Sequence, residues 1–207
     1  QGRSESAVFK EMLWKGKVLW GMMVFDTLKA FDYLAAREDI LADSIVSMGI
    51  SMGGTMALWS TALEPRIRAC IDLCSLAEYE SLITHQNLDR HGIYYYVPAL
   101  LKHFSAEELN QLTLPRPRLC VVGRHDGLTP IEGALSLDQT MRSHADAAGH
   151  PGRPGADRVR AVGAARRVMG SWASRRWSPT STFRALSTLP RKAWRRCRGR
   201  SSSPSAC

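Results

Sequence analysis

The stretch Gly-Ile-Ser-Met-Gly-Gly, residues 49–54, restricts the fold of this chain more than any other. An apolar run typical of a short buried strand precedes it, and a run with helical character follows it. Gly-x-Ser-x-Gly between a strand and a helix is the pattern of a nucleophile elbow, a sharp turn that exposes a serine hydroxyl. The sequence therefore predicts Ser51 as a nucleophile, and Gly49 and Gly53 as the small residues that this turn requires.

The helix that follows the serine adds a second prediction about this turn. A helix N-terminus presents N–H groups without intrahelical partners, and such groups stabilise negative charge. We expect the backbone N–H of Met52 to hold the oxyanion that forms when Ser51 attacks a carbonyl group. A Gly-rich turn without chemistry is the alternative, but both flanks of the motif favour the elbow.

Hydrophobic periodicity predicts an alternation of strands and helices over the first two thirds of the chain. The predicted strands span residues 44–48, 67–73 and 119–123. The predicted helices span residues 7–20 with a break at 16, 22–37, 55–63, 100–112 and 132 to about 141. This order is typical of an α/β fold with a mostly parallel sheet and helices on both faces. Three adjacent tyrosines, residues 94–96, favour core or cap packing over direct substrate contact.

A serine nucleophile needs a base, usually histidine, and an acid that orients this base. Asp126 follows the apolar strand 119–123, at the sheet edge where catalytic groups of parallel sheets collect. Asp-Gly is also an ordinary turn signal, and this alternative stays open. The order Ser, acid, His expected for this arrangement makes Asp126 the predicted acid.

No histidine fits the predicted base. His144 lies in or just after the helix that follows the acid, and His150 has no apolar strand before it. Both are interpreted as exposed bystanders, and His125 is expected to point away from its neighbour Asp126.

The charge of the chain is concentrated near its C-terminus. The formal net charge is +9, and residues 139–207 hold fourteen Arg, one Lys, two Asp and no Glu. This segment therefore carries +13, which leaves −4 for residues 1–138. Its composition predicts a disordered cationic tail, with one short basic helix at residues 159–169.

The five cysteines are odd in number and lack the spacing of a metal site. Cys70, Cys74 and Cys120 fall in apolar strand-like stretches, which favours buried thiols in a reducing compartment such as the cytoplasm. No apolar run is long enough for a membrane span. Nothing in the sequence calls for a metal or an organic cofactor.

Residues 7–137 resemble a bacterial group of the α/β-hydrolase superfamily related to dienelactone hydrolases and acetyl xylan esterases. The matching segments are LWKG (13–16), WGMM (20–23), GISMGGT (49–55), DLC (72–74), HGIYYYVP (91–98) and GRHDGLTP (123–130). The resemblance implies ester hydrolysis through an acyl-enzyme. Ser51 matches the nucleophile, Asp126 the acid, and the Met52 N–H one oxyanion donor.

Two departures from that family predict a partial α/β-hydrolase fold. The family has strands before the first helix seen here, including a loop that gives the second oxyanion donor. It also ends in a strand, a His-bearing loop and a helix, and nothing here matches that loop. We therefore expect a partial hydrolase domain at residues 1–137 and an irregular tail at residues 138–207. A shifted reading frame in a GC-rich gene is our hypothesis for this tail, and the nucleotide sequence near codon 138 tests it.

Three functions follow from these observations. The first is a serine carboxylesterase for small-molecule esters, weakened because no base is visible. The second is polyanion binding through the Arg-rich tail, which also holds Trp172, Trp177 and Trp194, although no nucleic-acid motif predicts a specific partner. The third is a gene fragment without activity of its own. Neither the substrate nor the oligomeric state follows from the sequence.

Overall fold

The computed structural model describes residues 3–147 and 158–162, all within the first of two units of the chain, Gln1–Ala165 and Arg166–Cys207. The helices are α1 Arg3–Trp14, α2 Leu19–Ala35, α3 Met52–Leu63, α4 Tyr79–Thr84, α5 Ala106–Gln111 and α6 Ile131–Ala147. The strands are β1 Val46–Ile50, β2 Ala69–Leu73, β3 Arg118–Gly123 and β4 Arg158–Val162. Short 3-10 turns lie at Ala42–Ser44, Leu88–Arg90, Ile93–Tyr95 and Leu100–Lys102.

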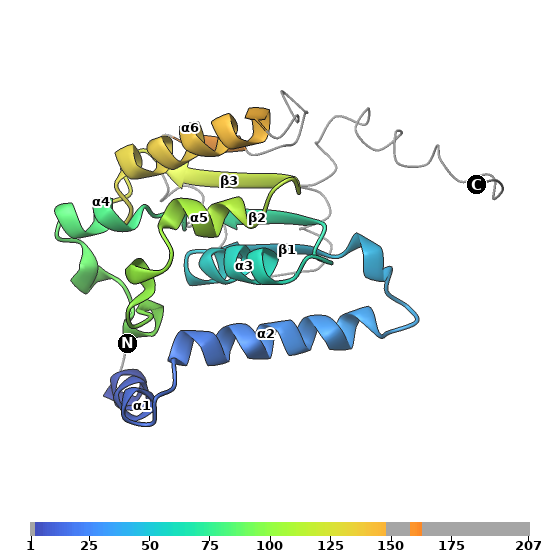
Figure 1. Ribbon diagram of the computed structural model, residues 1–207, viewed down its shortest axis with the longest axis horizontal. Helices are drawn as coiled ribbons and strands as arrows, with labels where there is room; N and C mark the ends of the chain where they lie inside the picture. Colours follow the sequence, from blue (N-terminus) through green and yellow to red (C-terminus); the bar gives the residue numbers. More distant parts are fainter. Residues whose placement is uncertain (1–2, 148–157, 163–207) are drawn as a thin grey trace, which may run out of the picture. The chain divides into compact units, whose positions relative to one another are not determined.

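The four strands form one parallel sheet in the order β1-β2-β3-β4 (Figure 1). The register places Gly49 of β1 opposite Asp72 of β2, and Asp72 opposite Cys120 of β3. Because all strands run the same way, the loops after β1, β2 and β3 meet at one edge of the sheet. The predicted parallel α/β sheet is confirmed, and this edge carries the elbow.

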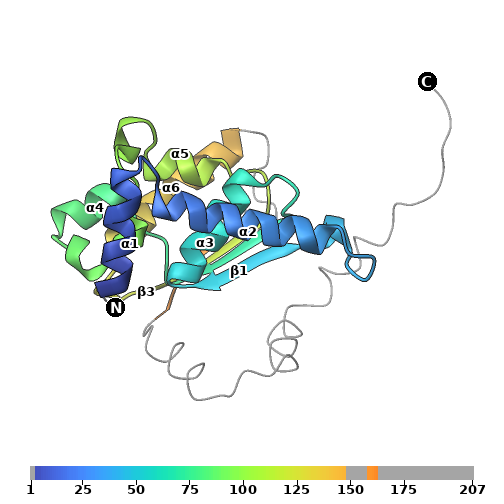
Figure 2. The ribbon, with the colours of Figure 1, turned by 90° about the horizontal axis from the view of Figure 1, so that it is seen from below.

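The described helices cover one face of the sheet. Figure 2 shows α2, α3 and α6 on the same side of β1 and β3. On that side Cys70 and Cys120 are buried, whereas Val46 and Met48 of β1 are 47% and 45% exposed. Of the two helical layers expected from the sequence, the described residues therefore contain one.

The core lies between the sheet and this helical layer. One buried cluster consists of Leu76, Ala106, Cys120, Val122, Ala134 and Leu137. It joins β3 to α5 and α6. It therefore fixes the position of β3, which leads into the loop of Asp126, called the acid loop below. Burial of these apolar side chains is the main stabilising contribution that this part of the fold makes.

Residues 79–102, called the cap segment below, lie on the connection from β2 to α5. A single helix was predicted for residues 100–112, but α5 begins only at Ala106. The reason is the capping box of Ser105 and Glu108, which fixes the helix start there. Before it, residues 100–102 form only a 3-10 turn, preceded by Ala99 at φ 60°.

The change in composition near residue 138 does not end the regular structure. Helix α6 continues to Ala147 because buried Met141 and Ala145 extend the face of Leu137 at spacings of four. The short helix predicted at residues 159–169 is wrong for its first residues, since 158–162 form β4 and pair with β3. The remaining tail lies outside the described residues, and its disorder and the frame shift remain predictions.

Candidate active site

The elbow between β1 and α3 holds Ser51 in a rare backbone conformation. Its φ is 54° and its ψ is −122°, a region that costs a non-glycine residue roughly 1–3 kcal/mol. Two hydrogen bonds hold this conformation. The N–H of Ser51 donates to the carbonyl O of Leu73 at 2.8 Å, and the N–H of Thr55 donates to the carbonyl O of Ser51 at 3.0 Å. The side chain is exposed at the turn, as a nucleophile must be.

The glycines of the elbow differ in what they permit. A Cβ on Gly49 would overlap the backbone carbonyl of Gly53, so this position must be glycine. A Cβ on Gly53 would meet nothing within 4 Å, so the steric reason given for that residue from the sequence is wrong. The second tight position is Gly54, where a Cβ would meet the side chain of Ser75. Ser75 lies in the segment that follows β2, so this requirement comes from outside the turn itself.

Helix α3 begins at Met52, directly after the serine. By helix geometry the Met52 N–H is one of the orphan donors at the N-terminus, and it lies beside the Ser51 hydroxyl along the chain. This placement fits the expected oxyanion donor. Its role in binding an oxyanion remains a prediction.

Ser51 opens into a cavity of about 190 Å³. The ends of β1 and β2 form one wall through Ser51, Met52 and Cys74. The cap segment and the loop after β3 complete the cavity with residues 90–92, 94–95 and 128–129. The cavity is small and mixed in polarity, which suits a polar reacting group more than a large substrate.

Asp126 lies half-buried in the loop after β3, where the sequence placed it. One carboxylate oxygen accepts the N–H of Leu128 at 2.9 Å, so the side chain supports its own loop. Burial first, and then the charge of Asp126, raise the pKa of the Cys74 thiol. Asp126 is therefore electrostatically close to a wall residue of the Ser51 cavity, although it does not line that cavity.

Two cap residues hold the acid loop. The guanidinium of Arg90 donates to the carbonyl O of Gly127, and the Nε2 of His91 donates to that of Leu128 at 3.0 Å. Gly127 permits this approach, because a Cβ there would lie 3.0 Å from the Nη1 of Arg90. The cap segment and the loop of Asp126 are thus tied together across thirty-seven residues of sequence.

The sequence reasoning missed His91, because it sought a base only after Asp126. His91 lines the Ser51 cavity and stacks on Tyr95 with ring centroids 5.6 Å apart. Since its Nε2 donates to a carbonyl, Nδ1 of the neutral ring can accept a proton. The position of His91 in the resembling segment HGIYYYVP was the only available signal.

The other histidines stay outside this cavity. His144 on α6 is exposed and contacts Glu107 and Gln111 of α5, each at 2.8 Å, in keeping with its interpretation as a bystander. His125 is also exposed, and His150 lies outside the described residues.

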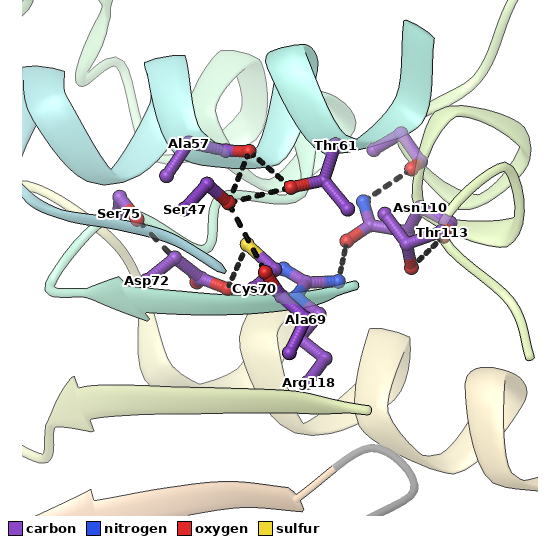
Figure 3. A network of polar contacts seen from close by, with 11 residues as sticks. Ser47, Ala57, Thr61, Ala69, Cys70, Asp72, Ser75, Asn110, Thr113 and Arg118 are labelled. Atoms are coloured by element: carbon purple, nitrogen blue, oxygen red, sulfur yellow. Dashed lines mark hydrogen bonds and ion pairs between the residues drawn. The ribbon is translucent and has the colours of Figure 1, made fainter. Parts of the chain in front are cut away.

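A buried polar network lies beneath the elbow (Figure 3). The Nε of Arg118 contacts the Oδ2 of Asp72 at 2.7 Å, with side chains only 3% and 1% exposed. Arg118 also donates to the amide oxygen of Asn110, and Ser75 donates to Asp72 at 3.4 Å. Since Ser75 also packs against Gly54, the network connects α5 and β3 to the turn that holds the nucleophile.

Aromatic rings join α2 to the cap segment. Trp20 is 1% exposed and stacks on Tyr94, with centroids 5.8 Å apart. Its ring also meets Tyr95 and Trp59 edge to face at 6.4 and 6.1 Å. Burial raises the pKa of Tyr95 well above its usual value, so this residue stays neutral. The expected packing role of the tyrosines is observed, and two of them also line the cavity.

Three further observations bear on the sequence predictions. Cys70, Cys74 and Cys120 are buried, as expected. No helix in the described part of the chain is long and apolar enough to cross a membrane. Within residues 3–147 and 158–162, no three His, Cys, Asp or Glu side chains gather as metal ligands would.

Comparison with known proteins identifies relatives. The model of the "Prolyl oligopeptidase family" matches residues 15–151. The protein "Putative hydrolase YtaP" of Bacillus subtilis (strain 168) is 54% identical over 141 residues. That alignment covers 68% of this chain and 47% of YtaP, so the chain spans about half the length of this curated relative.

Solved structures agree on the fold. A glucuronoyl esterase from Solibacter usitatus matches with a TM-score of 0.54 and 18% identity, over 68% of this chain and 43% of that one. A carbohydrate esterase family 15 glucuronoyl esterase from Caldicellulosiruptor kristjansonii matches with a TM-score of 0.51 and 20% identity, over 76% and 50%. At such identities the likeness concerns the fold, and the partial α/β-hydrolase fold predicted from the sequence is confirmed.

Proposed function

Because this chain belongs to the prolyl oligopeptidase family, within the α/β-hydrolase superfamily, we propose that it is a serine hydrolase of the carboxylesterase type. The observation that carries the proposal is the backbone of Ser51, held at φ 54° at the N-terminus of α3 and facing a cavity. A serine in an ordinary turn has no need of this strained conformation. The substrate that fits is a small-molecule ester.

The reaction begins with attack of the Ser51 Oγ on the ester carbonyl carbon, while a base takes the hydroxyl proton. The carbonyl oxygen becomes negative in the tetrahedral intermediate, and the Met52 N–H is placed to bind it. The carbon–oxygen bond of the ester then breaks, the alcohol leaves with the proton, and water hydrolyses the acyl-enzyme. Asp126 acts in this scheme as the acid that orients the base.

The rate of this reaction depends on the base. His91 lines the cavity but uses Nε2 to hold the acid loop, which leaves Nδ1 for proton transfer. Loss of a properly oriented triad member lowers rates by several orders of magnitude. We therefore propose an impaired esterase, whose turnover of a p-nitrophenyl ester is far slower than that of an intact one.

Covalent labelling tests the proposal without requiring fast turnover. A fluorophosphonate probe should add one phosphonyl group to the protein, and peptide mass spectrometry should place it on Ser51. Ser51→Ala should abolish the adduct, while Ser75→Ala, at another serine of the same cavity, should retain it. Equal labelling of Ser51→Ala and the parent protein would overturn the assignment of the nucleophile.

A further inference from the structure

A second and larger cavity lies within the cap segment. Its volume is about 410 Å³, and its described lining residues all fall between Tyr79 and Lys102. This volume lies within the range of roughly 300–1,000 Å³ that small-molecule sites occupy. One short, continuous segment therefore builds a site of its own beside the catalytic cavity.

The walls of this cavity are apolar. Leu82, Leu88, Val97 and Leu100 contribute aliphatic side chains, and Leu82 is only 1% exposed. The ring of Tyr96 lines it as well, and the hydroxyl of that residue is occupied, because it donates to the carbonyl O of Leu88 at 2.5 Å. Such walls favour a hydrocarbon group, which gains by leaving water and needs no polar partner.

The charges around the cavity argue against an ionic ligand. Lys102 is its one charged lining residue, and the adjoining hollow that shares Lys102 also holds Glu78, Glu80 and Glu108. A carboxylate drawn to the lysine would therefore meet three acidic side chains nearby. An uncharged ligand avoids this repulsion.

Tyr95 connects this cavity to the catalytic one. Its ring lines both cavities, and it is the residue that the two have in common. On the catalytic side it stacks on His91, and on the apolar side it meets Tyr79 edge to face at 6.0 Å. The two cavities therefore adjoin at Tyr95.

We propose that the apolar cavity binds an uncharged hydrocarbon arm of the ester whose carbonyl group reacts at Ser51. This inference rests on the proposed function and names its substrate class, esters with an apolar hydrocarbon arm long enough to reach from Ser51 into the cap segment. The short polar cavity at Ser51 takes the ester group, and the arm passes the edge of Tyr95 into the cap segment.

Binding of ketones measures this arm without any turnover. The Ser51→Ala protein is titrated calorimetrically with 2-butanone and with 2-decanone, which carry a carbonyl group but no ester bond. Each buried methylene tightens binding by about fourfold. We expect the longer ketone to bind at least about thirtyfold more tightly, since only part of the arm need be buried.

A substitution at an exposed residue of the apolar cavity tests whether the hydrocarbon arm binds there. Leu101 lines the cavity and is 53% exposed, so Leu101→Trp fills the mouth without disturbing the core. It should weaken 2-decanone at least about tenfold and leave 2-butanone unchanged, because only the longer ketone reaches that rim. Leu135→Trp, at a similarly exposed leucine on α6 outside these cavities, is the matched control and should change neither.

The outcomes separate this inference from the proposed function. Equal affinity for both ketones, or equal effects of the two tryptophan variants, overturns the inference. If the ketones behave as expected while the fluorophosphonate probe fails to label Ser51, the apolar site stands and the nucleophile assignment falls. In a competition titration, binding of 2-decanone without displacement of 2-butanone indicates two separate ligand sites. That result contradicts the binding of one ester across both cavities.

Discussion

The elbow and the cap segment both line the cavity at Ser51, but different physical effects hold them in place. At the elbow, backbone geometry decides the structure, because Ser51 has a positive φ and Gly49 has no room for a side chain. In the cap segment, side chains from distant parts of the chain decide it, such as Trp20 against Tyr94 and His91 against the loop of Leu128. Close backbone packing at the elbow therefore positions the nucleophile, whereas side-chain contacts between distant residues build its surroundings.

A methyl group at the elbow should have the largest effect on the fold. Gly49→Ala places a Cβ against the backbone carbonyl of Gly53, which cannot move without shifting α3. We expect a loss of unfolding free energy of about 4 kcal/mol or more, or failure to fold. Urea unfolding followed by circular dichroism measures it.

Gly53→Ala is the matched control for that substitution. Its Cβ would meet nothing, and alanine favours a helix over glycine, so stability should be unchanged or rise by about 0.5–1 kcal/mol. Similar losses for the two variants would show that the elbow does not depend on the close approach at Gly49.

Breaking the buried ion pair of Asp72 and Arg118 beneath the elbow should cause the next largest loss of stability. Asp72→Asn leaves the buried guanidinium of Arg118 without its carboxylate, which costs about 3–5 kcal/mol for ion pairs of this kind. Urea unfolding at neutral pH tests this value. A double variant, Asp72→Leu with Arg118→Met, should lose less than Asp72→Asn, because it removes both charges of the ion pair. If the double variant is the less stable one, the pair itself stabilises the fold.

Removing the hydrogen bond from His91 of the cap segment to Leu128 should have the smallest effect on stability. His91→Phe keeps a ring against Tyr95 but removes the hydrogen bond to Leu128, worth about 1 kcal/mol. The fluorophosphonate labelling rate of Ser51 should fall about fivefold if His91 acts only by holding the loop.

His125→Phe, at the exposed neighbour of Asp126, serves as the control and should label at the parent rate. A fall of a thousandfold or more for His91→Phe would instead identify His91 as the base. An unchanged rate would remove His91 from the site altogether.

The sequence predicted those features that depend on local pattern. The strand, the turn at Ser51 and the following helix came from residue types at fixed spacing, and the position of Asp126 came from the strand before it. The capping box that starts α5 is likewise a local pattern, although the predicted helix 100–112 began too early. In each case a few adjacent residues determine the geometry.

Other features depend on residues far apart in the chain, and no local pattern carries them. The bonds from Arg90 and His91 to the acid loop bridge thirty-seven positions, and the requirement at Gly54 comes from Ser75. The ion pair of Asp72 and Arg118 places two charges on strands that look apolar in sequence. Residues 158–162 form a strand because β3 offers them backbone partners, although the sequence predicted the start of a helix there.

The strained backbone of Ser51 has a consequence for how the chain can be assayed. An isolated or unfolded chain relaxes the residue to ordinary dihedral angles, because only the surrounding sheet and helix maintain φ 54°. Loosening of the first turn of α3 would therefore silence the serine before the domain as a whole melts. The reactivity of the Ser51 hydroxyl therefore reports the fraction of molecules in which the elbow is folded. It detects local opening of this turn that a spectroscopic signal averaged over the whole domain does not.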